Sequence, residues 1–137
     1  MGGLRFQWQR VAFGVFERRI ADDPVNRALL QDGYYPAMPQ RKINGVTLND
    51  AQYDKYLAMS GQIAHRILMP QVTSPAWTAL PVLVRNDIMK SSIEGGRAMA
   101  RGQLKLGSIG SDNDIIAKAL GNKRAQLEKQ PGSEDDY

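Results

Sequence analysis

The chain has 137 residues, a length that suits one domain with arms rather than several domains. It has no cysteine, which excludes disulfides, a thiol nucleophile and a zinc–thiolate site, and it has a single histidine, so we expect no metal centre and no cofactor. The formal net charge of +4 is not gathered in a dense run of Lys or Arg, so it permits contact with nucleic acid or a membrane without requiring either.

The first twenty residues carry more apolar surface than one packed helix needs. Wound as a helix, the segment has an apolar arc covering more than half of its circumference, whereas packing against a single core requires a narrower stripe. We therefore expect an amphipathic helix between its own domain and a neighbouring subunit. Its apolar residues are Leu4, Phe6, Trp8, Val11, Phe13, Val15, Phe16 and Ile20, and the expected contact residues are Phe6, Trp8, Phe13 and Phe16.

Two alternatives for this segment stay open. A helix on a membrane surface is less favoured, because Glu17 and two glutamines interrupt a purely cationic face. A short strand over Arg5–Gln9 is compatible with the alternation of polar and aromatic residues there. No apolar run approaches the ~20 residues that span a bilayer, and arginines interrupt any signal-peptide core. We expect synthesis in a cytoplasm and delivery by assembly.

A short helix is predicted next. Asp23 followed by Pro24 is typical of a helix cap and first helical position, and the apolar residues that follow indicate a helix over residues 24–31. Gly33 is placed to end it in the left-handed conformation.

Residues 34–42 form a predicted extended arm, because they contain two prolines and no helical period. Tyr34 and Tyr35 begin this arm. They either dock on another molecule or pin the arm to its own domain, and both interpretations remain open. An extended arm of this kind is a common means for one subunit to wrap another.

The longest predicted helix follows a tight turn at Asn44-Gly45. Asn49 and Gln52 stand in the capping-box spacing, which starts a helix at Asp50. Apolar residues then recur at helical spacing as far as Leu68, and we expect Pro70 to end the helix. His65 lies at the edge of the apolar stripe, where a half-exposed structural histidine is favoured over a catalytic one.

A second long helix is predicted from Pro81 to about Gln103. Ser74-Pro75 resembles another helix start, and Trp77 and Leu80 can pack back on the first long helix. We expect the two helices to form a hairpin that closes a small core. Its second helix has an apolar arc of Val84, Ile88, Met89, Ile93, Met99 and Ala100 and a polar arc of Asp87, Lys90, Glu94, Arg97 and Arg101.

Gly95-Gly96 lies in the middle of this helix, on its apolar face. Each glycine costs a helix roughly 0.5–1 kcal/mol relative to alanine, and the usual compensation is the close approach of another backbone. We therefore expect another helix to cross Glu94–Arg97 at short range and treat both glycines as candidate interaction residues.

The end of the chain is predicted to be hinged. The glycines and serines of residues 107–111 indicate a flexible joint, followed by a helix from Asp112 to about Leu120. Gly121-Asn122 is expected to interrupt this helix, with a polar helix resuming at residues 123–129. The acidic last residues have nothing to bury.

The sequence thus predicts an all-α fold in three parts. Residues 1–42 hold the N-terminal helices and the arm, residues 43–106 the helical hairpin module, and residues 107–137 the hinge, a short C-terminal helix and an acidic tail. No motif assembles a catalytic site, so the predicted function is interaction or assembly rather than catalysis.

The central stretch resembles a module at the C-terminal end of large virion-associated proteins of tailed bacteriophages, of the internal or ejection type. The resemblance rests on NGVTLNDAQYDKYLAMSG, SPAWTALP and a charged helix ending ARGQL. The matching positions are Gly45, Leu48, Gln52, Tyr53, Asp54, Tyr56, Gly61, Ser74, Pro75, Trp77, Leu80, Pro81 and Ala100. It covers under half of the chain. This chain lacks the long N-terminal regions of such proteins, so their enzymatic activities are not carried over.

The resemblance implies a non-enzymatic virion protein, made in the host cytoplasm, that acts in particle assembly or genome delivery. Its implied partners are other virion proteins and further copies of itself. The alternative function is that of a small basic nucleic-acid-binding protein. Weak contact with nucleic acid is compatible with the charge, and contact with a membrane surface is not favoured.

Overall fold

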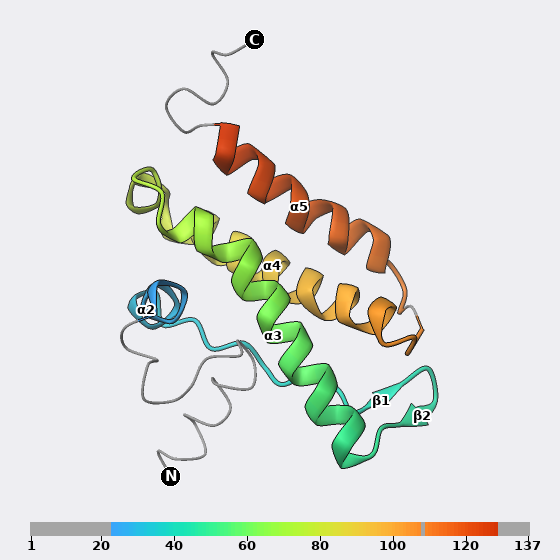
Figure 1. Ribbon diagram of the computed structural model, residues 1–137. Helices are drawn as coiled ribbons and strands as arrows, with labels where there is room; N and C mark the ends of the chain where they lie inside the picture. The colour runs from blue at the N-terminus through green and yellow to red at the C-terminus, as the bar shows by residue number, and fades with distance from the viewer. Residues whose placement is uncertain (1–22, 108, 129–137) are drawn as a thin grey trace.

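The computed structural model describes residues 23–107 and 109–128, which form a mainly helical fold with one two-stranded sheet (Figure 1). Four α-helices are present in these residues: α2 (Pro24–Gln31), α3 (Asp50–Val72), α4 (Val82–Gln103) and α5 (Asp112–Glu128). A 3-10 helix, η2 (Trp77–Ala79), joins α3 to α4, and a hairpin of β1 (Lys42–Ile43) and β2 (Val46–Thr47) precedes α3. The expected all-α class is therefore correct at the level of a mainly helical fold.

The two long helices, α3 and α4, pack against each other, and α5 lies along α4 (Figure 1). The short helix α2 packs against α3. The core consequently receives side chains from all four helices and not from α3 and α4 alone.

Two clusters of buried side chains fill this core. The first cluster contains Val25, Ala28, Leu29, Ala64, Leu68, Trp77, Met89 and Ile93. The second cluster contains Ile43, Leu48, Tyr56, Ile63, Ile67, Ala100 and Ala119. The expected burial of Trp77 is confirmed, since only 5% of the residue is exposed.

The close crossing expected at Gly95-Gly96 is confirmed, and it involves two helices of the same chain. A Cβ atom on Gly96 would lie 2.8 Å from the Ser60 carbonyl oxygen and 2.9 Å from the Ala64 amide nitrogen on α3. A Cβ atom on Gly95 would lie 2.5 Å from the Cβ of Ala119 on α5. The two glycines therefore let α4 approach α3 on one side and α5 on the other.

The predicted beginnings of the first two described helices are confirmed. The Asp23 carboxylate accepts from the Asn26 amide at 3.0 Å, α2 spans residues 24–31, and Gly33 has φ +64°. At α3, the Asn49 side chain accepts from the Gln52 amide at 2.8 Å, and the Gln52 side chain accepts from the Asn49 amide at 2.9 Å.

The tight turn at residues 44–45 is also present. Asn44 and Gly45 have φ values of 51° and 81°, the conformation that joins the strands of a two-residue hairpin. The paired strands around it are only two residues each, and no strand was predicted there. Val46 and Thr47 are both exposed, so the alternation that marks a half-buried strand is absent.

The prediction that Pro70 ends the first long helix is wrong, because α3 continues to Val72. Gln71 is completely buried in the continued turn, and its side-chain amide donates to the Ile67 carbonyl at 3.0 Å. Pro70 has no amide hydrogen to donate to the carbonyl of Arg66. Arg66 is exposed, so water can reach this side of the helix. Burial beyond the proline therefore outweighs the lost hydrogen bond.

Two further boundaries differ from expectation. The turn after α3 contains a 3-10 helix that begins at Trp77, not a helix begun at Pro75, although the Ser74 hydroxyl does accept from the Ala76 amide. The expected interruption at Gly121-Asn122 is absent, because α5 runs through it to Glu128. The Asn122 side chain donates to the Ser91 hydroxyl of α4 at 2.6 Å, which anchors α5 at this point.

Candidate interaction site

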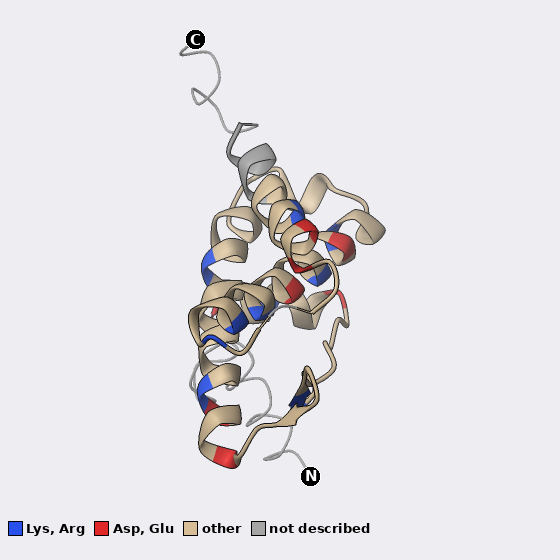
Figure 2. Ribbon diagram, turned by 90° about the vertical axis from the view of Figure 1, so that its right-hand side faces the viewer, with Lys and Arg blue, Asp and Glu red and all other residues tan. Residues whose placement is uncertain are grey.

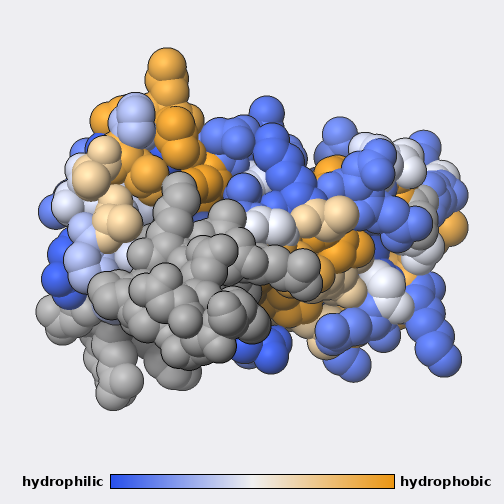
Figure 3. All heavy atoms as spheres, turned by 90° about the horizontal axis from the view of Figure 1, so that it is seen from above, coloured by the Kyte–Doolittle hydropathy of each residue, from blue (hydrophilic) through white to orange (hydrophobic). Residues whose placement is uncertain are grey.

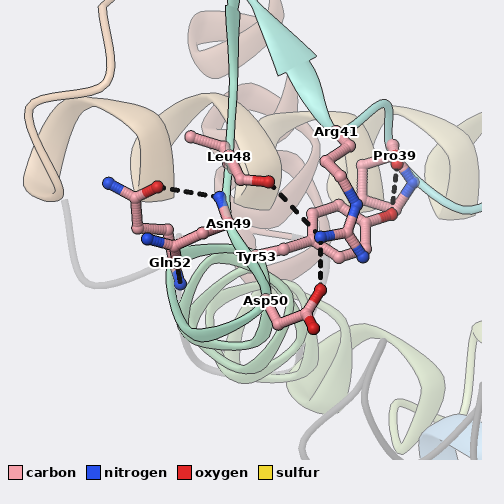
Figure 4. Close-up of polar contacts among 7 residues, drawn as sticks. All are labelled: Pro39, Arg41, Leu48, Asn49, Asp50, Gln52 and Tyr53. Atoms are coloured by element: carbon pink, nitrogen blue, oxygen red, sulfur yellow. Dashed lines mark hydrogen bonds and ion pairs between the residues drawn. The ribbon is translucent and has the colours of Figure 1, made fainter.

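The arm of residues 34–42 is fastened to the chain's own helices by side chains that donate to its carbonyls. Arg97 of α4 donates to the Ala37 carbonyl, and the Tyr53 hydroxyl of α3 donates to that of Pro39 (Figure 4). The guanidinium of Arg41 stacks over the Tyr53 ring, with 4.4 Å from Cζ to the ring centroid, and pairs with Asp50 at 2.8 Å. These contacts favour the interpretation in which the arm is pinned to its own domain.

The two tyrosines that begin the arm have different surroundings. Tyr34 is half-buried against the first cluster, and burial, reinforced by the Glu94 carboxylate and partly offset by Arg97, raises the pKa of Tyr34. Tyr35 is 46% exposed. Tyr34 therefore acts as a packing residue, and Tyr35 is the member of the pair that a partner can reach.

Beneath the arm lies an open hollow of about 340 Å³ between α4, the start of α5 and residues 38–40. Arg97 lines it with Glu94, and burial lowers the pKa of Arg97 while nearby Tyr56, Tyr34 and Glu94 act in the opposite direction. Among the described residues no carboxylate forms an ion pair with Arg97. Its observed role is to hold the arm through Ala37.

A buried ion pair also lines the hollow. Arg101 of α4 donates to both carboxylate oxygens of Asp112, at 2.6 and 3.2 Å, and to the Tyr56 hydroxyl at 2.7 Å. Asp112 also accepts from the Ile109 amide at 3.1 Å. Burial by itself lowers the pKa of Arg101, but the hydrogen bonds to Asp112 and Tyr56 outweigh it and leave the pKa raised. This pair fixes the start of α5 against α3 and α4.

Sequence reasoning missed this pair and placed Arg101 on an exposed polar arc. The two residues are eleven positions apart and meet only because the loop after α4 reverses the chain, where Lys105 and Gly107 have positive φ. An arginine at the end of one predicted helix and an aspartate at the start of the next is the only signal the sequence offers.

The single histidine also links two elements. His65 Nε2 lies 2.7 Å from Asp23 Oδ1, and 21% of the histidine side chain is exposed. Asp23 uses its other carboxylate oxygen to cap α2. The pair therefore ties the start of α2 to the middle of α3, in line with a structural histidine.

Four of the candidate contact residues, Phe6, Trp8, Phe13 and Phe16, lie outside the described residues. Gly95 and Gly96 are buried in the crossings with α5 and α3. The structure thus places the two glycines in intramolecular packing.

The first turn of α4 presents an apolar surface that the sequence prediction did not single out. Val82, Leu83 and Val84, here called the α4 patch, are 48%, 81% and 41% exposed. Figure 3 shows hydrophobic side chains gathered at the end of the molecule where α4 begins. The prediction that Val84 belongs to the core is wrong, because three consecutive apolar residues point in three directions around a helix and cannot all face one core.

Charged residues of both signs occur along the helices (Figure 2). Four of the described cations pair with carboxylates: Arg41 with Asp50, Arg85 with Asp32, Arg101 with Asp112 and Lys118 with Asp87. These pairings reduce the positive charge that the described surface can offer to phosphate groups.

Residues 23–107 and 109–128 contain no helix long and apolar enough to cross a membrane. They also contain no group of three or more His, Asp or Glu side chains arranged to hold a metal ion. Comparison of the chain with protein-family models, curated proteins and solved structures found no match.

Proposed function

We propose that this protein is a non-enzymatic component of a tailed-bacteriophage particle, an internal, ejection or tail-associated protein that acts in particle assembly or genome delivery. The observation that carries the proposal is the α4 patch, because a compact body that leaves Leu83 81% exposed between two exposed valines has a surface suited to another protein. Other virion proteins and further copies of the chain are its partners.

The residues on both sides of the patch are fastened to other elements of the fold, as a docking surface requires. Arg85, one residue after the patch, donates to both oxygens of Asp32, at 2.9 and 3.0 Å, and joins α4 to the end of α2. Leu80, just before the patch, packs against the first cluster. The patch is therefore held in place from both sides.

The resemblance of residues 43–104 to the phage module gives the class of partner. Several of its matching positions have structural roles, including Gln52 in the capping box of α3, Trp77 in the first cluster and Tyr56 in the second. In this proposal α3 and α4 are the two helices of the module, and the surface they leave exposed makes the contacts in the particle.

Nucleic-acid binding is the weaker alternative. A protein that binds DNA through its backbone neutralises several phosphates with unpaired Lys and Arg. Here four described cations already pair with carboxylates, two of them, Arg85 and Arg101, in half-buried or buried positions.

The direct test is to purify the particles of the phage whose genome encodes this chain on a density gradient and to quantify the chain in them by mass spectrometry. A virion component is present at a fixed copy number per particle and stays with the particles through repeated purification. A chain that is abundant in the infected cell and absent from purified particles would overturn the proposal.

A further inference from the structure

We propose that the hollow beneath the arm binds a small zwitterion of the α-amino-acid type. Its carboxylate accepts from Arg97 and Tyr56, its ammonium group pairs with Glu94, and its apolar side chain packs against the aliphatic lining. The inference goes beyond the proposed function, because it concerns a different surface from the α4 patch.

The size of the hollow limits the ligand. Its volume is about 340 Å³, at the small end of the roughly 300–1,000 Å³ that is usual for small-molecule sites. This suits a ligand about as large as one amino acid better than a nucleotide. Because the hollow is open to solvent, such a ligand can enter while the arm stays in place.

Arg97 has hydrogen-bond donors that the fold does not use. Its Nη2 donates to the Ala37 carbonyl, and no other acceptor for this side chain is found in residues 23–107 and 109–128. A guanidinium carries five N–H groups, so most of them remain for a ligand. Burial also lowers the pKa of Arg97, which means that its charge is partly desolvated and gains from a nearby anion.

Tyr56 supplies a second donor in the same place. The residue lines the hollow and is only 1% exposed, and its hydroxyl accepts from Arg101 at 2.7 Å. Within the described part of the chain, nothing accepts the hydrogen of this hydroxyl. A buried donor without an acceptor is costly. Tyr56 and Arg97 therefore suit the two oxygens of a carboxylate.

Glu94 makes the site selective for a zwitterion. It lines the hollow three residues before Arg97, the spacing of neighbours on a helix surface, yet the two form no ion pair. Glu94 pairs with no other described residue either. Arg101 and Asp112 already neutralise each other. The two carboxylates in the lining disfavour a phosphate, whereas a lone cation beside a lone anion matches a ligand with both charges.

The remaining lining is apolar and gives a ligand's side chain a surface to cover. Met38 and Ile109 are exposed, while Ile43 is buried and Ile115 half-buried. Burying apolar surface here favours an aliphatic side chain. The site therefore prefers leucine to glycine.

Isothermal titration calorimetry of the full-length chain tests the proposal with L-leucine as the probe. Glycine lacks the apolar side chain, 4-methylpentanoate lacks the amino group, and 3-methylbutylamine lacks the carboxylate. Leucine should bind most tightly. Removing either charged group should weaken binding by roughly tenfold or more, because each leaves a partly buried charge of the protein without its partner.

Two variants assign the charges. Arg97→Gln should weaken leucine binding by roughly tenfold or more. Glu94→Gln should remove the preference for leucine over 4-methylpentanoate and leave the thermal midpoint unchanged, because Glu94 has no described partner to lose. Lys90→Gln and Asp87→Asn are matched controls, since they remove one charge of each sign from α4 outside the hollow and should not change leucine binding.

Three results would overturn the proposal. The first is no binding of leucine up to its solubility limit. The second is binding of 4-methylpentanoate or 3-methylbutylamine as tight as that of leucine, which would make the hollow a site for a simple anion or cation. The third is unchanged leucine binding in Glu94→Gln. None of them bears on the presence of the chain in virions, so the two proposals fail separately.

Discussion

Gly96 and Gly102 lie in the same helix and have opposite surroundings. A Cβ on Gly96 would meet the backbone of α3 at 2.8 and 2.9 Å, whereas a Cβ on Gly102 would meet nothing within 4 Å. Glycine therefore serves packing at one position and only lowers helix propensity at the other.

Gly96→Ala should consequently destabilise the protein by about 1–3 kcal/mol, the usual cost of overpacking, because the atoms it meets are backbone atoms that cannot move aside. Gly102→Ala should stabilise it by about 0.5–1 kcal/mol through helix propensity. Urea unfolding followed by circular dichroism measures both. Equal stabilisation by the two substitutions would show that α3 and α4 do not cross closely at Gly96.

Tyrosine ionisation gives a second prediction at the residue scale. Burial raises the pKa of Tyr34 and of Tyr53, with Glu94 adding to the first and Arg41 opposing the second. The folded state therefore holds these two protons more tightly than the unfolded state does. The resulting contribution to the free energy of unfolding is complete below the ordinary tyrosine pKa of about 10 and is lost as the pH rises through the folded-state pKa.

Ultraviolet titration should therefore show that part of the tyrosine absorbance change occurs at a higher pH than the rest. In denaturant this high-pH part should disappear. Tyr34→Phe and Tyr53→Phe should each reduce the part of the absorbance change that occurs at high pH and leave the part at lower pH unchanged. If either variant instead lost the part of the absorbance change at lower pH, the hydroxyl of the substituted tyrosine would not be buried.

Two ion pairs join α4 to α5 and differ mainly in burial. Arg101–Asp112 has side chains that are 9% and 7% exposed, whereas both side chains of Lys118–Asp87 are 56% exposed. Removing one partner of a buried pair leaves the other charge without compensation, but an exposed charge is simply hydrated.

Asp112→Asn should therefore cost about 3–5 kcal/mol and loosen the start of α5, and Asp87→Asn should cost less than about 1 kcal/mol. Thermal unfolding gives the stabilities, and hydrogen exchange of the α5 amides locates the effect. If the two variants unfold alike, the Arg101–Asp112 pair is solvated and does not fix α5.

Trp77 tests the junction between the two long helices. The residue begins η2 and belongs to the first cluster with side chains from α2, α3 and α4. Trp77→Ala should cost about 3–5 kcal/mol, as truncation of a buried aromatic residue typically does, and this is a large part of a small domain's stability. Unchanged thermal stability would mean that Trp77 is a surface contact residue.

At the scale of elements, local signals in the sequence predicted helix beginnings better than helix ends. The caps at Asp23 and Asn49 depend on residues three positions away, and both are present. The stop expected at Pro70 is overridden by the complete burial of Gln71, and the stop expected at Gly121 by the hydrogen bond from Asn122 to Ser91. Such tertiary contacts are not encoded in local spacing.

The interaction surfaces were less predictable than the elements. Gly95-Gly96 was recognisable because glycine inside a helix has a measurable cost that needs a compensation. The α4 patch was not recognised, because the sequence pattern predicts burial for an apolar residue beside the core-facing side of a helix. Only the positions of the neighbouring helices show that these residues are exposed. For Arg101 the sequence pattern predicts exposure, because the residue is charged, whereas its ion pair with Asp112 of α5 is buried.

For the whole molecule, the central claim is that this chain works by assembling through its apolar surfaces. Sedimentation velocity over a wide concentration range at physiological salt tests the claim most directly. The account predicts species heavier than the 15.2 kDa monomer that grow with concentration and persist in high salt, because apolar contacts are not screened. A single 15.2 kDa species at every concentration would contradict it.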